Sequence, residues 1–196
     1  MKPFLRAALT AVPAVLFAGT ADAHTGLGHS GGFAAGLVHP FLGLDHLIAM
    51  LAAGVYAGWR GGASSWRMLL VAMAAGCGGM MLGVAGIPAN PVAAGIVGSA
   101  LLLGVALLLD LRLGTAWALA AAAAFGLIHG HAHGAEMALE PGMWAYVAGL
   151  LAATASLLIA GAACGAAGRA YPRLGETGIR AFGGLVGAGA LFLAAG

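Results

Sequence analysis

The first group of residues that could do chemistry lies between His39 and His46. These two histidines are seven residues apart, and Asp45 directly precedes the second. On a regular helix this spacing places both rings on one face about two turns apart, with Asp45 one residue off that face. Pro40 suits the first turn of a helix, so we expect the helix to begin close to His39. Imidazole and carboxylate groups arranged in this way can bind a metal ion or carry protons.

A second group of the same chemistry occupies residues 129–136. His129 and His133 are four residues apart and face the same way on a helix, and Glu136 continues their stripe. His131 points to the opposite side of a regular helix and is a weaker candidate. Imidazole suits nickel, zinc, copper and iron, and carboxylate helps to neutralise the charge of a cation. The predicted inner set of imidazoles is His39, His46, His129 and His133.

These polar groups stand out because the rest of the chain is strongly apolar. Hydrophobic residues make up 62% of the 196 residues and charged residues only 7%, whereas a typical soluble domain has about 25% charged residues. Apolar stretches long enough to span a bilayer, roughly 20 residues, follow one another along the chain. The composition predicts an all-α, polytopic transmembrane helix bundle. A net charge of +2 without a basic run predicts no nucleic-acid partner.

The first 23 residues have the features of a secretory signal peptide. Lys2 and Arg6 form a positively charged start, an apolar run follows, and Ala21 and Ala23 supply small residues before a cleavage point. An uncleaved first membrane helix is the alternative, which the short apolar run disfavours. Residues 24–196 then form a single transmembrane domain. Its six predicted spans are 33–59, 66–87, 91–111, 115–135, 142–168 and 177–195.

The arginines predict how these spans are oriented. After the signal peptide, every positive side chain falls at the connections between spans one and two, three and four, and five and six. The positive-inside rule places these connections in the cytoplasm of a bacterial-type inner membrane, with both mature termini periplasmic. The two histidine-containing groups then lie in the outer half of the bilayer. His24 and His29, on the outer N-terminal segment, are weaker candidates for collecting ions.

Small and aromatic residues give expectations about packing. Four glycine pairs at i and i+4 lie within spans, and such pairs let helix backbones approach closely, within one subunit or between the subunits of a homo-oligomer. The pairs are Gly54–Gly58, Gly79–Gly83, Gly161–Gly165 and Gly183–Gly187. Trp59, Trp66 and Trp144 lie near predicted membrane interfaces and are expected to form aromatic belts. The sulfur-containing residues of span two could offer ligands, although packing is their expected role; they are Met73, Cys77, Met80 and Met81.

Both histidine-containing groups resemble the motifs of a known family. His39-x5-Asp45-His46 resembles the His-x5-Asp-His signature of the HupE/UreJ nickel permeases. Residues 129–136 are similar to that family's second signature, with Ile128 in place of its leading Phe. The resemblance implies a secondary permease that transports Ni²⁺, without a tightly bound cofactor, for hydrogenase or urease maturation. The residues that it implies for the metal are His39, Asp45, His46, His129, His133 and Glu136.

Two other functions fit some of the same residues. Three histidines and a carboxylate can hold zinc with an open position for water, so an intramembrane zinc-dependent hydrolase is one alternative. An accessory membrane subunit that senses metal or pH through its histidines is the other. We favour the permease and expect no enzyme activity. The sequence has no Walker-type nucleotide-binding motif that would couple transport to ATP hydrolysis.

Overall fold

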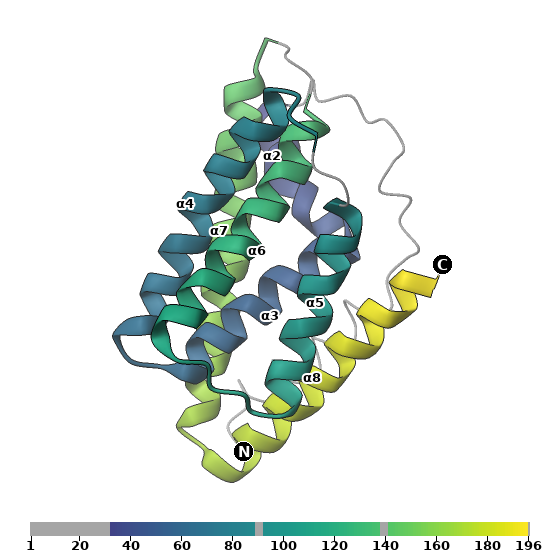
Figure 1. The fold of residues 1–196 in the computed structure, drawn as a ribbon. Helices are drawn as coiled ribbons and strands as arrows, with labels where there is room; N and C mark the ends of the chain where they lie inside the picture. Colours follow the sequence, from purple (N-terminus) through teal and green to yellow (C-terminus); the bar gives the residue numbers. More distant parts are fainter. Residues whose placement is uncertain (1–31, 89–91, 138–140, 196) are drawn as a thin grey trace.

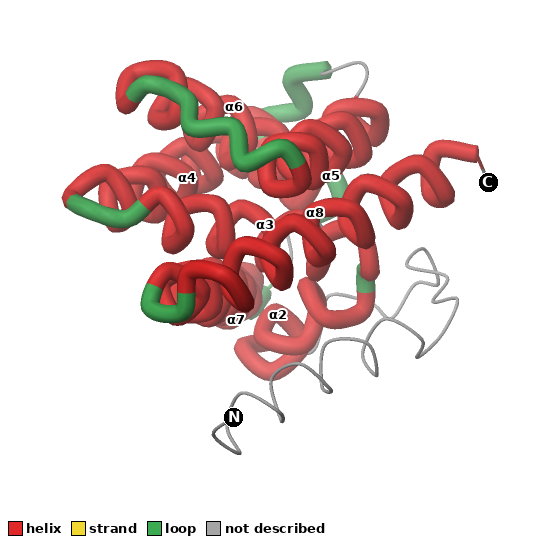
Figure 2. Tube along the Cα trace, turned by 90° about the horizontal axis from the view of Figure 1, so that it is seen from below, coloured by secondary structure: helices red, strands yellow, loops and turns green. Residues whose placement is uncertain are grey.

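The computed structural model describes residues 32–88, 92–137 and 141–195, and this part of the chain forms seven helices and no strand (Figure 1). The helices are α2 (Gly32–Leu42), α3 (Leu44–Arg60), α4 (Ala63–Val84), α5 (Val92–Leu108), α6 (Thr115–Ala135), α7 (Met143–Arg169) and α8 (Pro172–Ala195). Helix α3 lies in the middle of the others when the bundle is viewed along its length (Figure 2). The predicted signal peptide, His24 and His29 lie outside the described residues.

The outer surface of the bundle is apolar. Large hydrophobic side chains are exposed on every helix except the central α3, among them Leu70, Leu102, Ile159 and Phe192. Helices α4, α7 and α8 are long and apolar enough to cross a bilayer, and the bent pair α2–α3 is a fourth candidate if it counts as one span. An apolar surface of this extent is suited to lipid rather than to water. The chain is therefore a multi-pass, all-α membrane protein.

The helices coincide with the six predicted spans, and α6 matches its predicted range of 115–135 at both ends. Two of the six segments, α5 and α6, are too short or too weakly apolar to qualify as membrane spans by length and composition. Helix α5 has only 17 residues, and the three histidines of α6 lower its mean hydropathy. The helical character of all six segments is thus confirmed, whereas six crossings of the bilayer stay a prediction.

The first predicted span differs from expectation because it contains a sharp break. Helices α2 and α3 meet at Gly43 and are bent by 82°. Pro40 lies inside the last turn of α2 rather than in a first turn, and Gly43 has extended backbone angles, φ −96° and ψ 110°, that interrupt the helix. His39 and His46 therefore belong to different helices. The prediction that they share one helical face was wrong.

Glycines allow the helices to pack in tight pairs. The most extensive pairing joins α4 to α6, followed by α3 to α7 and α5 to α8. A Cβ atom on Gly126 would overlap the backbone of Ala72 on α4, and one on Gly54 would overlap the backbone of Leu158 on α7. These positions accept no side chain, so the glycines set the distance between the helices. A packing role within the subunit is confirmed, and a homo-oligomer stays a prediction.

The three arginine-bearing connections lie together at one end of the bundle, at the bottom of Figure 1. We call this the arginine end. Trp59, at the end of α3, is only 6% exposed, and its indole N–H donates to Asp110 Oδ1 at 2.6 Å. The prediction that Trp59 belongs to an aromatic belt was therefore wrong. Trp66 and Trp144 are exposed, as a belt requires.

Candidate metal site

Helix α6 buries all three histidines of the second motif in its last two turns. His129, His131 and His133 are 2%, 7% and 7% exposed. Gly130 and Gly134, each one residue after a motif histidine, pack directly against the backbone of α4. This contact fixes the rotation of α6 about its axis. It leaves His129 and His133 on the side that faces α2 and α3.

Helices α2 and α3 bring two further imidazoles to the same place. The ring centroids of His46 and His133 are 4.7 Å apart, and those of His46 and His129 are 5.6 Å apart. The ring of His39 lies 5.1 Å from that of His133. We call these four residues the histidine cluster. The bend at Gly43 lets both α2 and α3 contribute a ring to it.

Hydrogen bonds determine which ring nitrogens of the cluster are available. His129 Nδ1 lies 2.9 Å from the carbonyl oxygen of Phe125, which can only accept, so Nδ1 carries the proton and Nε2 has the free lone pair. His46 Nδ1 donates in the same way to Asp45 Oδ1 at 3.0 Å. Both Nε2 atoms, and both ring nitrogens of His133, are buried without a hydrogen-bond partner among the described residues.

Unpartnered buried nitrogens are costly, so their concentration at one place needs a reason. A buried polar group without a hydrogen bond costs free energy, and most native proteins contain few such groups. An imidazole that donates from one nitrogen to a carboxylate or a carbonyl is the usual form of a metal-ligating histidine. The cluster therefore has the donor chemistry of a site for a transition-metal ion.

Asp45 acts mainly on His46. Its Oδ1 accepts both the backbone N–H of His46, at 2.8 Å, and the ring Nδ1–H. The Asp45 side chain is 34% exposed, against 17% for His46. A carboxylate in this position orients the imidazole and makes its other nitrogen a better ligand.

The remaining motif residues lie at the edge of the cluster or beyond it. Glu136 is the C-cap residue of α6 and is exposed. His131 turns away from the cluster, and its Nε2 donates to the carbonyl oxygen of Ile87 at 2.7 Å. The sequence analysis missed Tyr146, whose ring lies 5.8 Å from that of His39. No motif residue precedes Tyr146 by a helical turn, so the sequence gives no local signal for it.

The rings of the cluster do not converge on one point. Their planes meet at 71° for His39 and His133, at 87° for His46 and His129, and at 45° for His46 and His133. In the described part of the chain, no group of three or more histidine, cysteine, aspartate or glutamate residues is arranged to hold a metal ion. Ligation of an ion by these imidazoles therefore requires their side chains to rotate.

A cavity of about 30 Å³ opens beside the histidine cluster, between helices α3, α4, α6 and α7. His129 and His133 line one part of it, and Met50, Met73 and Met80 line the rest together with small and apolar residues. We call it the methionine cavity. Met50 was missed by the sequence analysis, although it follows His46 by four residues and shares its helical face.

The fold and the cluster define a multi-pass helical membrane protein with buried metal-ligand chemistry. The family model described as HupE / UreJ protein matches residues 12–193. Protein HupE from Rhizobium leguminosarum bv. viciae is 36% identical over 185 residues, which cover 94% of this chain and 95% of that protein. No solved structure matches the chain. The chain belongs to the HupE/UreJ family, as its two motifs predicted.

Proposed function

We propose that this protein is a secondary permease for a divalent transition-metal ion, and that the ion is nickel taken up for hydrogenase or urease maturation. The observation that carries the proposal is the histidine cluster, in which His46, His129 and His133 hold buried ring nitrogens that no described residue hydrogen-bonds. Membership of the HupE/UreJ family, which is associated with nickel accessory function for these enzymes, supports the choice of ion.

The position of the cluster supports a direction for transport. Asp45 and His46 lie in the first turn of α3, whose last turn carries Arg60, and His129 and His133 lie at the far end of α6 from the arginine end. With the arginine end in the cytoplasm of the inner membrane, the cluster faces the periplasm. An ion then meets His39 and Asp45 first and passes to the buried imidazoles.

Weak, exchangeable ligation fits a permease. A transported ion has to bind well enough to enter and weakly enough to leave. The imidazoles are contributed by three helices, and in the described part of the chain they are not arranged to hold one ion. Rings that rotate onto the ion and away again can accept it and release it.

The test is ⁶³Ni²⁺ accumulation in cells that lack their own nickel transporters. Cells that express the wild-type chain should accumulate the isotope, and cells that express His46→Ala should stay at background. His131→Gln is the matched control, since His131 lies outside the cluster and its Nε2–H donates to the carbonyl of Ile87, a bond that the longer amide of glutamine can replace. Membrane levels of each variant are compared by immunoblot. Equal accumulation by the wild type and His46→Ala would overturn the proposal.

A further inference from the structure

We propose that the methionine cavity is a second ion position, on the arginine side of the histidine cluster, that binds a late transition-metal ion through thioether sulfur. The inference rests on the proposed transport function and extends it to the step after the imidazoles. Its first support is position. Met50 lies one turn after His46 on α3, and Phe125 lies one turn before His129 on α6. Both steps run toward the arginine end, whereas Met80 on α4 packs level with Gly134, so the cavity extends from beside the cluster toward the arginine end.

The helices around the cavity explain why space exists there. Helices α3 and α7 form one glycine-packed pair and α4 and α6 form another, whereas α4 makes far fewer contacts with α3 and with α7 than with α6. The cavity is lined from all four helices and lies where the two pairs face each other. Packing within a pair is tight, so free space collects between the pairs.

The donor atoms around the cavity select a chemical class of ion. Its side-chain donors are the thioethers of Met50, Met73 and Met80, the hydroxyl of Thr154 and the two imidazoles of the cluster that line it. No carboxylate is among the described residues that line it. Thioether and imidazole favour late transition metals, whereas Mg²⁺, Ca²⁺ and Mn²⁺ prefer oxygen ligands. Mg²⁺, Ca²⁺ or Mn²⁺ would lose water ligands on entering the cavity and would find no carboxylate oxygen among the described lining residues to replace them.

The size of the cavity strengthens this selection. A volume of about 30 Å³ has room for one or two waters, each of which needs roughly 10–15 Å³ on this measure. An ion with a complete shell of water does not fit. The ion therefore has to exchange water for protein donors, which Mg²⁺ does reluctantly.

Buried imidazoles in its lining distinguish the cavity from an ordinary packing gap. His129 is 2% exposed and His133 is 7% exposed, and each holds a ring nitrogen without a partner among the described residues. Met50 and Met80 are 4% and 8% exposed, so their sulfurs are shielded from lipid and water. Methionine has three rotatable bonds in its side chain and can move its sulfur onto an ion.

The first test uses the triple variant Met50→Leu, Met73→Leu and Met80→Leu, which removes the sulfurs with little change in volume. The matched control is Met68→Leu with Met81→Leu, since Met68 is a buried methionine of α4 that does not line the cavity and Met81 is exposed. At sub-saturating ⁶³Ni²⁺ the triple variant should accumulate at least about tenfold less than wild type, a loss typical of weakened metal ligation. The control should match wild type.

The second test measures binding directly, with Ag⁺ as a probe of thioether sulfur. Purified full-length protein in detergent is titrated by calorimetry, with Cys77→Ser and Cys164→Ser in every sample because both thiols are free and exposed. The triple variant should bind one Ag⁺ fewer than wild type, and the control should bind the same number. If the melting temperature of the triple variant falls, Met73→Leu alone, the least buried of the three changes, replaces it.

The outcomes separate this inference from the proposed function. Unchanged Ag⁺ stoichiometry in the triple variant would overturn the site, and a lost Ag⁺ with unchanged nickel uptake would overturn its place on the ion's route. If His46→Ala loses uptake while the triple variant does not, the proposed permease function is supported and the methionine cavity is not on the ion's route. If the wild type transports no nickel, the titration still decides whether the cavity binds a soft ion.

Discussion

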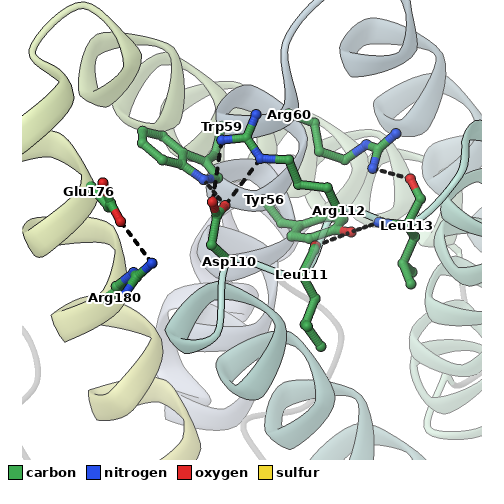
Figure 3. A network of polar contacts seen from close by, with 9 residues as sticks. All are labelled: Tyr56, Trp59, Arg60, Asp110, Leu111, Arg112, Leu113, Glu176 and Arg180. Carbon is green, nitrogen blue, oxygen red and sulfur yellow. Dashed lines mark hydrogen bonds and ion pairs between the residues drawn. The ribbon is translucent and has the colours of Figure 1, made fainter.

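At the arginine end of the bundle, polar side chains pair with one another or with backbone carbonyls, whereas at the opposite end His46, His129 and His133 each keep at least one buried ring nitrogen without a partner among the described residues. Figure 3 shows the first arrangement: the Tyr56 hydroxyl donates to the carbonyl of Leu111 at 3.0 Å, and Trp59 and Arg112 both donate to Asp110. Arg60 donates to the carbonyl of Leu113, although its buried Nε has no partner among the described residues.

Polar groups that stabilise the fold and polar groups that bind a ligand differ in whether they have partners within the protein. Contacts at the arginine end join α3 to the connection between α5 and α6, so they hold helices in place. At the cluster, three histidines that contact one another through their rings keep ring nitrogens that have no hydrogen-bond partner in the described part of the chain. Ionisable groups buried at membrane depth are expensive, and those without a structural partner are the ones expected to meet a ligand.

The largest effect should come from removing a second imidazole of the cluster. We expect His129→Ala to reduce ⁶³Ni²⁺ uptake to background, because it removes an Nε2 that Phe125 already holds in the ligating form. Loss of one buried imidazole also removes lining from the methionine cavity. The variant should remain in the membrane at wild-type level. Wild-type uptake by this variant would show that unpartnered nitrogen does not mark the site.

A smaller loss should follow from changing the carboxylate next to the cluster. Asp45→Asn keeps the shape of the side chain at position 45. It weakens the hydrogen bond that orients the His46 ring, because Nδ1–H then donates to a neutral amide oxygen and not to a carboxylate. Changes of this kind typically cost about 10–100-fold in metal affinity. Uptake measured across nickel concentrations should show a raised half-saturation concentration with a largely retained maximum. An unchanged half-saturation concentration would contradict an orienting role for Asp45.

At the arginine end, a change should affect stability and spare transport. Trp59→Phe removes the indole N–H that Asp110 accepts at 2.6 Å, and a hydrogen bond to a charged group is worth about 1.5–3 kcal/mol. Partial exposure of Asp110, at 25%, reduces the expected cost to about 1 kcal/mol. Thermal unfolding in detergent should detect the decrease, while nickel uptake per molecule stays at the wild-type value. Loss of nickel uptake by Trp59→Phe at unchanged stability would contradict the assignment of a purely structural role to the arginine end.

The smallest effect should be a pH dependence at Asp110, which lies in the connection outside the spans. Burial alone would raise the pKa of Asp110, but hydrogen bonds from Trp59 and Arg112 outweigh it and hold this pKa below the ordinary 3.8. Because the folded-state pKa is the lower one, the stabilisation is present above the unfolded value and is lost as pH falls through the folded value. The melting-temperature gap between wild type and Asp110→Asn should therefore shrink from about pH 6 to about pH 3. A gap that stays constant would mean that the charge of Asp110 contributes nothing.

Local patterns in the sequence were enough to predict the helices and the residues that meet in the cluster. The apolar stretches marked each helical segment, and the spacing of His129 and His133 placed both rings on one side of α6. The break at Gly43 was missed because a proline can mark either the beginning or the end of a helix, and the sequence does not show which applies to Pro40. The position of the break depends on how α2 packs on α7, which no local pattern encodes.

Contacts between distant segments could not be predicted in the same way. Trp59 looked like an interface residue from its place in the span, and its partner Asp110 lies 51 residues away. Met73 lines the cavity only because the α4–α6 pair packs against the α3–α7 pair. Such features arise from tertiary packing, which single-residue patterns record only weakly.

The most direct measurement of the central claim is X-ray absorption at the nickel K-edge of purified, nickel-loaded protein. The claim is that the imidazoles of the histidine cluster bind the ion. The spectrum should show the multiple scattering of imidazole rings, and this scattering should weaken in His129→Ala and in His133→Ala but not in His131→Gln. A shell of oxygen alone, or a spectrum that both alanine variants leave unchanged, would contradict the claim.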